Sequence, residues 1–546
     1  MHERWYQQAV IYCLDVDTFQ DSDGDGIGDL PGLISRLDYL ARLGVTCLWL
    51  NPIHPSPDRD DGYDVSDFYG VHPDIGTLGD FVELIHQADN RGMKVIIDLV
   101  VNHTSDEHPW FQSARTSPDS PYRDWYVWSV EEPSDLHQGM VFPGQQDATW
   151  TWDDVAGAWY YHRFYDFQPD LNMANPDVRA EVDKIIGFWL QLGVAGFRMD
   201  AAPFIIELTK PNDPNPPKDF DWLTRFRERL SWRRGDAVIL AEANVERDEL
   251  VKYFGDGRRL PMLFNFMLNQ RTFLALAREE AAPLVQAMAE SPTIPGSCQW
   301  ATFLRNHDEV DLGRLVGHEH DEVFAAFGPD PDMQLYGRGI RRRLAPMLGG
   351  DRRRIEMAYA LQFTLPGTPV IRYGDELGMG DDLSLPERDA IRTPMQWSDQ
   401  LNGGFSIAAA KQLRRAVITG GEYGFEKINV ASQEHDRESL LAWFQRALHS
   451  LRECPEFGAG QASYVDSGQR SVLALVGDAP GGTMLALTNL AGKACTVDLG
   501  PQPTQEGPVR EVFADRAYDP PADDLTGLRL GAYGYRWLRL RETLGR

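Results

Sequence analysis

The sequence predicts an α/β protein: a (β/α)8 TIM barrel with a subdomain inserted after the third strand and a C-terminal antiparallel β domain. Three observations lead to this prediction. Short apolar runs alternate with segments of helical period, eight such runs recur, and after about residue 458 the pattern changes to short alternating strands. Buried strands that alternate with amphipathic helices are typical of a parallel sheet, and eight strands close a barrel.

The elements follow one another in a regular order. After a first strand, Leu33, Leu37, Leu40 and Ala41 have helical spacing, and Gly44 ends that helix. A second helix is expected over 78–90, with Gly92 after it. The eight predicted strands are Val10–Leu14, Val45–Leu50, Val95–Val101, Val194–Asp200, Ala237–Glu242, Met262–Phe266, Ala301–Asn306 and Val370–Tyr373.

Two interruptions and one change of pattern define the expected domains. The barrel is expected to comprise 1–103 and 168–457, with an extra insertion at about 311–350. Residues 104–167 are polar and rich in Trp, Tyr and Pro, which indicates an inserted subdomain over the barrel mouth. Residues 458–546 are expected to form a β-sandwich, and the basic run at 337–344 is expected to begin a solvated or salt-bridged helix.

Composition excludes several classes of partner. The chain has 546 residues and a net charge of −29, so it lacks the basic surface that nucleic acids and anionic membranes require. It shows no apolar signal segment and no apolar run of about 18 residues, and we expect a cytoplasmic protein. The five cysteines are odd in number and widely spaced, so they predict neither a disulfide framework nor a zinc site.

The loop from Asp21 to Asp29 has carboxylates on alternate residues, separated by glycines. Such a loop offers an oxygen cage to a hard cation, and we expect Ca²⁺, with Mg²⁺ as the alternative ion. The expected ligands are Asp21, Asp23, Asp25, Asp29 and the carbonyl of Ile27. The loop is not an EF-hand, because Gly32 stands where a bidentate Glu is needed, and a solvated Asp/Gly loop is the competing interpretation.

Polar residues gather where the predicted strands end. These ends are Asp98–His103, Arg198–Asp200, Glu242, Arg305–Asp308 and Tyr373–Glu376. Because the carboxyl ends of barrel strands meet at one mouth, we expect these groups to converge there. Arg198 and Asp200 alone are equally well explained as a structural ion pair, and each His alone as a structural residue. Their convergence favours a functional site.

The chemistry of these groups suggests a different catalytic role for each. Carboxylates on adjacent strands can lie about 5 Å apart, the separation of a retaining glycosidase. Beside Arg198, Asp200 is expected to have a low pKa and to act as nucleophile. Glu242 has no cation near it in the sequence, so we expect a raised pKa and a role as general acid and base. Asp308, His103 and His307 are expected to hold sugar hydroxyls, with both His residues neutral.

These residues, in this order, resemble the α-amylase superfamily, glycoside hydrolase family 13. The matching motifs are Asp98–His103, Gly196–Asp200, Glu242 with its neighbours, Asn306–Asp308 and Gln168–Asn172. The resemblance implies that Asp200 is the nucleophile, Glu242 the acid/base and Asp308 the transition-state stabiliser. The substrate-binding residues that it implies are Asp60, Tyr63, His103, Phe164, Arg198, His307 and Arg392.

The same resemblance implies further features of the site. Asp60 with Arg392 would close the pocket at the non-reducing end, so an exo-acting enzyme for small substrates is implied. Asn102 and Asp170 match positions that often hold a second Ca²⁺, and no organic cofactor is implied.

Within this family the chain is most similar to trehalose synthases, the maltose α-glucosyltransferases. The motifs that carry this likeness include 55–64, 102–111, 126–129, 299–309 and 337–346. The implied partner is a small α-glucoside such as maltose or trehalose; a homo-oligomer stays open. Four stretches depart from the pattern and are expected to face the leaving-group side: 209–217, 263–266, Arg372 and 412–421.

Other functions compete with this one. An exo-acting α-glucosidase, or a transglucosylase with another acceptor, would use the same catalytic residues. A non-catalytic amylase-like binding protein should have lost Asp200 or Glu242, and both are present. An unrelated metal-dependent barrel hydrolase would need His and carboxylate ligands on one metal, whereas the evident cage lies far upstream of the strand-end motifs.

Overall fold

The computed structural model describes residues 4–502 and 508–542 of the chain. Eight parallel strands form a closed barrel in the order β1-β14-β10-β9-β8-β7-β3-β2, so the predicted fold class is confirmed. The strands are β1 (Ile11–Leu14), β2 (Cys47–Leu50), β3 (Lys94–Leu99), β7 (Gly196–Met199), β8 (Val238–Ala241), β9 (Met262–Phe264), β10 (Gln299–Phe303) and β14 (Thr368–Arg372). The ends of the expected domains at 1–3 and 543–546, and the segment 503–507, lie outside the described residues.

Alternate residues of each barrel strand belong to different apolar clusters. Ile11 and Cys13 of β1 join Trp49 and Leu240 in a small cluster inside the barrel. Tyr12 and the other alternate positions belong to the large cluster between the strands and the surrounding helices. This alternation follows from the two-residue period of a strand, and it leaves the polar residues after each strand at the barrel mouth.

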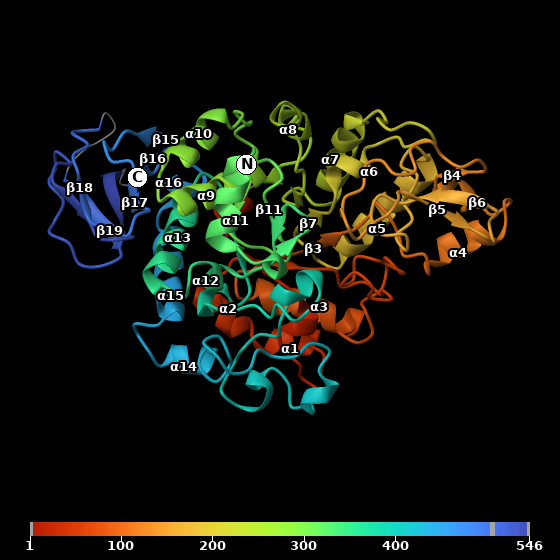
Figure 1. Cartoon of the computed structure of the whole chain (residues 1–546), viewed down its shortest axis with the longest axis horizontal. Helices are drawn as coiled ribbons and strands as arrows, with labels where there is room; N and C mark the ends of the chain where they lie inside the picture. The colour runs from red at the N-terminus through yellow and green to blue at the C-terminus, as the bar shows by residue number, and fades with distance from the viewer. Residues whose placement is uncertain (1–3, 503–507, 543–546) are drawn as a thin grey trace.

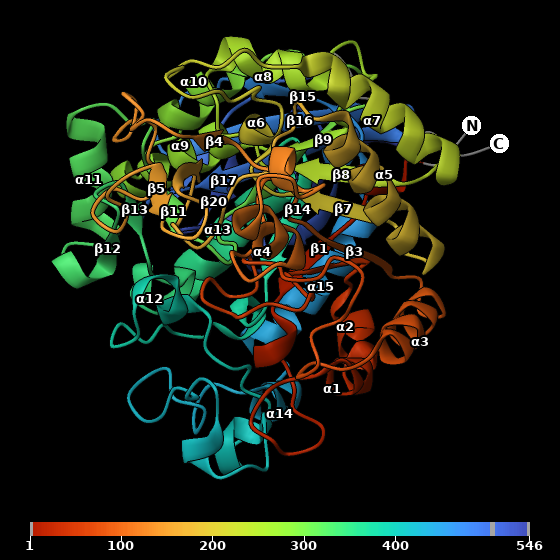
Figure 2. The ribbon, with the colours of Figure 1, turned by 90° about the vertical axis from the view of Figure 1, so that its right-hand side faces the viewer.

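Helices surround the barrel, and in Figure 2 α5 and α7 lie outside β7 and β8. The helix expected to end at Gly44 is two helices, because Arg36 has non-helical backbone angles (φ −103°, ψ 0°) and its side chain turns to Gln20 and Trp397. The major helices are α1 (Leu30–Ser35), α2 (Leu37–Leu43), α3 (Leu78–Asp89), α5 (Pro176–Gln191), α6 (Ala202–Ile205), α7 (Phe220–Arg233), α8 (Arg247–Phe254), α9 (Phe266–Arg278), α10 (Ala282–Glu290), α12 (Leu344–Met347), α13 (Arg352–Thr364), α14 (Val430–Glu434), α15 (Leu440–Arg452) and α16 (Pro455–Gly458).

Two insertions rise over the barrel mouth. The first follows β3 and contains α4 (Pro109–Thr116) and a sheet of β4 (Trp128–Ser129), β6 (Ala158–Tyr161) and β5 (Trp150–Asp153). The second follows β10 and contains β11 (Val310–Asp311), α11 (His318–Phe327), β12 (Gln334–Leu335) and β13 (Gly339–Ile340). Phe142 of the first insertion stacks on Tyr336 of the second, with ring centroids 5.0 Å apart, so the insertions support each other.

The run 337–344 is salt-bridged, as predicted, through Arg338 with Asp311 and Arg342 with Asp381, but it is not a helix start beyond its last residue. Gly339 and Ile340 form β13, and α12 begins only at Leu344. Arg341 and Arg343 are buried and donate to backbone carbonyls, Arg341 to Leu385 (2.6 Å) and Arg343 to Tyr373 (2.7 Å). Loop carbonyls at a barrel mouth need donors, and these arginines supply them.

The C-terminal β domain lies at one end of the molecule and β4–β6 lie at the other, with the barrel between them (Figure 1). Its five-stranded sheet has the order β15 (Gln461–Val465), β16 (Val472–Ala479), β17 (Gly482–Asn489), β21 (Tyr535–Glu542) and β19 (Arg510–Ala514), and β18 (Cys495–Val497) pairs with β20 (Leu528–Leu530). Among the described residues, no helix has the length and apolarity needed to span a bilayer.

Candidate active site

A pocket of about 460 Å³ lies at the carboxyl ends of the barrel strands. Eight of the predicted catalytic and substrate-binding residues line it: Asp60, Tyr63, His103, Phe164, Asp200, Glu242, His307 and Asp308. Arg198 and Arg392 are buried beside it and bind the lining residues. The structure therefore brings all ten together, including residues from both sides of the first insertion.

Arg198 joins the two carboxylates at the base of the pocket. Arg198 and Asp200 are two positions apart in an extended segment, so their side chains lie on one side of the sheet. Nη1 of Arg198 donates to Asp200 over 2.7 Å, while Nη2 donates to Glu242 from the neighbouring strand β8. Glu242 thus has a cation partner that its sequence neighbours did not reveal, and one guanidinium fixes both carboxylates.

The pKa of one of the two carboxylates differs from what the sequence predicts. Burial raises the pKa of Glu242 to about 8, with Arg198 opposing and the charge of Asp200 adding to the rise. The raised pKa of Glu242 confirms the prediction. The predicted low pKa of Asp200 is wrong: burial raises that pKa above its ordinary value, because Arg198 also neutralises Glu242 and Asp98 and only partly offsets the burial.

Asp98 and Tyr63 support Arg198 from the other side. The Tyr63 hydroxyl donates to Asp98 over 2.7 Å, and Trp49 Nε1 donates to the second oxygen of Asp98 over 2.8 Å. Since the only phenol proton of Tyr63 is directed at Asp98, the contact of 2.7 Å between Tyr63 and His307 requires that His307 Nε2 donate. Burial lowers the pKa of His307 to about 4, so the imidazole is neutral, as predicted.

Asp308 is surrounded by donors. His307 Nε2, which has one proton to share between Tyr63 and Asp308, lies 3.0 Å from one oxygen of Asp308, and Arg388 and Arg392 each lie 3.2 Å from the other. Although burial opposes it, the contacts with His307, Arg388 and Arg392 hold the pKa of Asp308 well below its ordinary value. Asp308 is therefore the permanent anion of the pocket.

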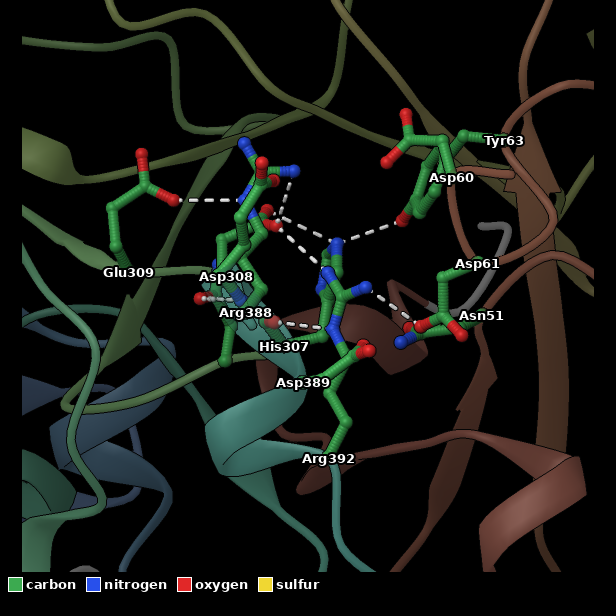
Figure 3. Close-up of polar contacts among 12 residues, drawn as sticks. Asn51, Asp60, Asp61, Tyr63, His307, Asp308, Glu309, Arg388, Asp389 and Arg392 are labelled. Carbon is green, nitrogen blue, oxygen red and sulfur yellow. Dashed lines mark hydrogen bonds and ion pairs between the residues drawn. The ribbon is translucent and has the colours of Figure 1, made fainter. Parts of the chain in front are cut away.

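Figure 3 shows the contacts at the closed end of the pocket. Arg392 does not pair with Asp60; its Nη1 lies 2.7 Å from the neighbouring Asp61. Asp60 accepts instead from Gln168 over 2.8 Å, and burial raises its pKa to about 7 although Arg388 opposes the rise. The reason is local, because Asp61 has a positive φ of 51° that turns its side chain away from that of Asp60.

His103 and Phe164 form one side wall. Their rings meet edge to face with centroids 5.2 Å apart, and His103 Nε2 lies 3.0 Å from the carbonyl oxygen of Tyr63. Burial lowers the pKa of His103 to about 4, so this imidazole is neutral as well. The wall is therefore apolar with one fixed polar edge, which suits a sugar ring.

The residues predicted to bind metal fall into two groups. Ligand atoms of Asp21, Asp23 and Asp29 all lie within 4.8 Å of one another. Asp25 is outside this group, and its carboxylate accepts from the Ile27 N–H over 2.8 Å. Asn102 and Asp170 lie side by side near His103, and burial raises the pKa of Asp170 to about 7.

Most of the stretches that depart from the family pattern lie off the pocket. None of 209–217, 263–265, Arg372 or 412–421 is among the described residues that line it, whereas Phe266 does line it. Arg372 pairs with Asp15, and Arg415 pairs with Asp61 behind the closed end. The expectation that these stretches face the leaving-group side is therefore wrong for Arg372 and 412–421, whereas the stretch 263–266 reaches the pocket through Phe266.

Sequence reasoning assigned no role to four side chains of the site: Asp61, Asp98, Arg388 and Arg415. Only Asp98 carried a usable signal, since it is a buried acid in the middle of an apolar strand. Conversely, Glu376 was expected at the mouth, but it lies buried against the hydroxyls of Tyr12 and Tyr39, each 2.7 Å away.

Two family descriptions match the chain. "Alpha amylase, catalytic domain" matches residues 12–326 and 341–457, and "Sucrose hydrolase-like, C-terminal domain" matches residues 481–539. Together they span both the barrel and the C-terminal sheet.

The chain is similar to several named proteins. It is 43% identical to the trehalose synthase of Thermus thermophilus over 99% of its own length, although it spans only 56% of that protein. It is 40% identical to the trehalose synthase of Pimelobacter sp. (strain R48), covering 99% of this chain and 97% of that one. The crystal structure of an α-amylase from H. orenii superposes with a TM-score of 0.79 at 28% identity, over 98% and 99% of the two chains.

Proposed function

The chain belongs to the α-amylase family, glycoside hydrolase family 13, and on that premise we propose that it interconverts maltose and trehalose by a retaining, double-displacement mechanism. The observation that carries the proposal is the guanidinium of Arg198, which holds Asp200 and Glu242 together at the base of a sugar-sized pocket. The relatives that are trehalose synthases support the choice of substrate.

In the first step the Asp200 carboxylate attacks the anomeric carbon of the non-reducing glucose of maltose. The bond from this carbon to the bridging oxygen breaks, and Glu242 gives its proton to that oxygen, which becomes the 4-hydroxyl of the released glucose. A pKa of about 8 keeps Glu242 protonated at neutral pH, as this step needs. Asp308, as the permanent anion, stabilises the positive charge that develops on the ring.

In the second step the released glucose turns within the pocket and presents its anomeric hydroxyl. Glu242 takes the proton of this hydroxyl, the hydroxyl oxygen attacks the glucosyl carbon, and the ester bond to Asp200 breaks. The product is α,α-1,1-linked, and no water is consumed. Retention of the free glucose requires a covered pocket, and Met140 and Phe142 of the first insertion line its upper part.

The departures from the trehalose synthase pattern do not contradict this function. Except for Phe266 they lie off the pocket, so they leave most of the side chains that line it unchanged. A hydrolase or a transglucosylase with another acceptor uses the same two carboxylates, and the products formed from maltose decide between these functions.

The test is to incubate the protein with maltose and to separate trehalose from glucose. Trehalose is expected as the main product, with glucose as a minor one. Asp200→Asn and Glu242→Gln should each lower turnover by about 10³-fold or more while the melting temperature stays unchanged. Glucose as the only product would identify a hydrolase. Near wild-type turnover by either variant would show that the roles assigned to Asp200 and Glu242 are wrong.

We further propose that the loop of Asp21, Asp23 and Asp29 holds a structural Ca²⁺, with Mg²⁺ as the alternative. Three carboxylates within 4.8 Å repel one another, and a hard cation offsets this repulsion. Asn102 and Asp170 are the proposed ligands of a second ion. The cytoplasmic location and a homo-oligomeric state remain predictions.

A further inference from the structure

A line of charged side chains runs behind the closed end of the pocket (Figure 3). Arg392 is 2% exposed and uses three nitrogens: Nε donates to the His307 carbonyl over 2.9 Å, Nη2 lies 3.2 Å from Asp308, and Nη1 lies 2.7 Å from Asp61. The guanidinium therefore has contacts in two directions, toward the pocket through Asp308 and away from it through Asp61.

Asp61 has a left-handed backbone. Its φ of 51° lies in a region that glycine adopts without strain and that, among other residues, Asp and Asn adopt most often. The two oxygens of its carboxylate accept from two different arginines. One oxygen binds Arg392 and the other binds Arg415.

Arg415 reaches this site from a loop far along the chain. It follows β14 by more than forty residues and lies in the stretch 412–421, which departs from the family pattern. Its side chain is 10% exposed, and Nη2 also lies 3.1 Å from Asp389. This loop therefore places the guanidinium of Arg415 on the side of Asp61 that faces away from the pocket.

The contact of Arg415 determines how Arg392 can bind. While Arg415 occupies one oxygen of Asp61, only the other oxygen is open to Arg392, and the contact is single. Without Arg415, both oxygens become available, and the preferred geometry of an arginine with a carboxylate is the two-bond fork. Such a fork would draw Arg392 toward Asp61 and away from Asp308.

We propose that Asp61 and Arg415 are positioning residues for the glucosyl transfer, which hold Arg392 against Asp308 and His307. The kinetic consequences of this inference rest on the proposed function. The geometry of Arg392 does not depend on the proposed function. Asp308 is the group that stabilises the transition state, so displacement of Arg392 affects kcat more than KM.

The kinetic test compares Arg415→Met and Asp61→Gly with Arg414→Met. Asp61→Gly removes the carboxylate but suits the positive φ, so it separates the role of the side chain from that of the turn. Arg414 is the matched control, because it is the adjacent arginine and pairs with Asp58 instead of Asp61. The readouts are kcat and KM on maltose and on an aryl α-glucoside.

Arg415→Met and Asp61→Gly are each expected to lower kcat about tenfold or more, with the smaller change in KM. The double variant should be no worse than the poorer single variant, because both act through Arg392. Arg415→Lys should recover most of the loss, and Arg414→Met should stay within about twofold of the wild type. Equal rates for Arg415→Met and Arg414→Met, or multiplied losses in the double variant, would overturn the inference.

A crystal structure of Arg415→Met tests the geometry without any turnover. Arg392 is expected to bind both oxygens of Asp61 and to leave Asp308. An unmoved Arg392 refutes the inference even if the enzyme is active. A wild type that turns over no α-glucoside refutes the proposed function, while the position of Arg392 in the variant still decides the inference.

Discussion

Asp200 and Glu242 share the guanidinium of Arg198, and this sharing determines how the two carboxyl groups are protonated. One cation cannot neutralise two neighbouring carboxylates, so the pair holds a proton at neutral pH. The proton belongs on Glu242, whose pKa burial raises to about 8. Asp200 also accepts from Arg198, over 2.7 Å, and in the proposed mechanism it is the nucleophile.

The pH dependence of the reaction follows from Glu242. In the proposed mechanism Glu242 is the general acid and must be protonated, so kcat/KM on maltose should fall as the pH rises through about 8. Because its pKa is about 8, Glu242 keeps its proton at neutral pH and loses it in the alkaline range. The value of kcat/KM is therefore expected to decrease, not increase, with rising pH. The measurement is a pH profile of kcat/KM.

The control for this profile is an aryl α-glucoside with a strongly acidic phenol as leaving group. Its departure needs no proton, so its alkaline decline should be weaker than that of maltose. A maltose profile that stays level far above the pKa of Glu242 would show that another group donates the proton.

Single residues also show what the sequence could and could not predict. The spacing of Arg198 and Asp200 indicated an ion pair, because the two-residue period of a strand is a local property. The contact of Arg198 with Glu242 depends on the register of β7 against β8, which no local pattern encodes. Likewise, Asp60 and Asp61 are adjacent and chemically identical, and only the backbone angle of Asp61 decides which of them reaches Arg392.

Among the elements, the acidic loop before α1 has a structural role of its own. Asp29 is the N-cap of α1 and accepts from the Gly32 N–H over 2.6 Å. Asp21 accepts from three loop N–H groups and from the Ser406 hydroxyl, so it ties this loop to the segment after β14. A cation at these carboxylates would therefore stabilise both the helix start and the contact between distant segments.

Removal of the proposed cation should lower the melting temperature by on the order of 5 °C, since binding to the folded state alone stabilises it. Asp21→Asn should abolish this dependence on chelator, whereas Asp119→Asn, an exposed acid outside the loop, should preserve it. The measurement is thermal unfolding before and after verified metal removal. Identical curves for the wild type would count against the site.

Elements were easier to predict in number than in extent. The eight barrel strands were all expected, because buried apolar runs are distinct in sequence, yet the structure shifts most of their ends, by up to three residues. The break between α1 and α2 was not expected, since Arg36 leaves the helix to reach Gln20 and Trp397, both of them partners from other segments.

For the whole molecule, the important feature is the continuous apolar contact between barrel and C-terminal sheet. Leu475, Met484 and Trp537 of the sheet belong to the same cluster as Phe444 of α15 and Ile355 of α13. The sheet therefore completes the core on that side of the barrel, and the two parts are expected to unfold together.

Trp537→Ala tests this coupling. Trp537 is fully buried and contacts Phe513 with ring centroids 4.9 Å apart, so its removal should destabilise the chain by about 3–5 kcal/mol. Activity and sheet structure should be lost at the same, lower temperature. Tyr464→Ala, at a 40% exposed position of the same sheet, should have a small effect. Activity that survives the melting of the sheet would show independent domains.

The pairing of β1 with β14 has a consequence for how the protein is made. Ile11 lies beside Val370, so the barrel seam joins the start of the chain to a strand synthesised much later. At about 5–20 residues per second, the ribosome delivers β14 on the order of 20–70 s after β1. Throughout that interval the edge of the nascent sheet is unpaired, so it is a site where other chains can add a strand until β14 emerges.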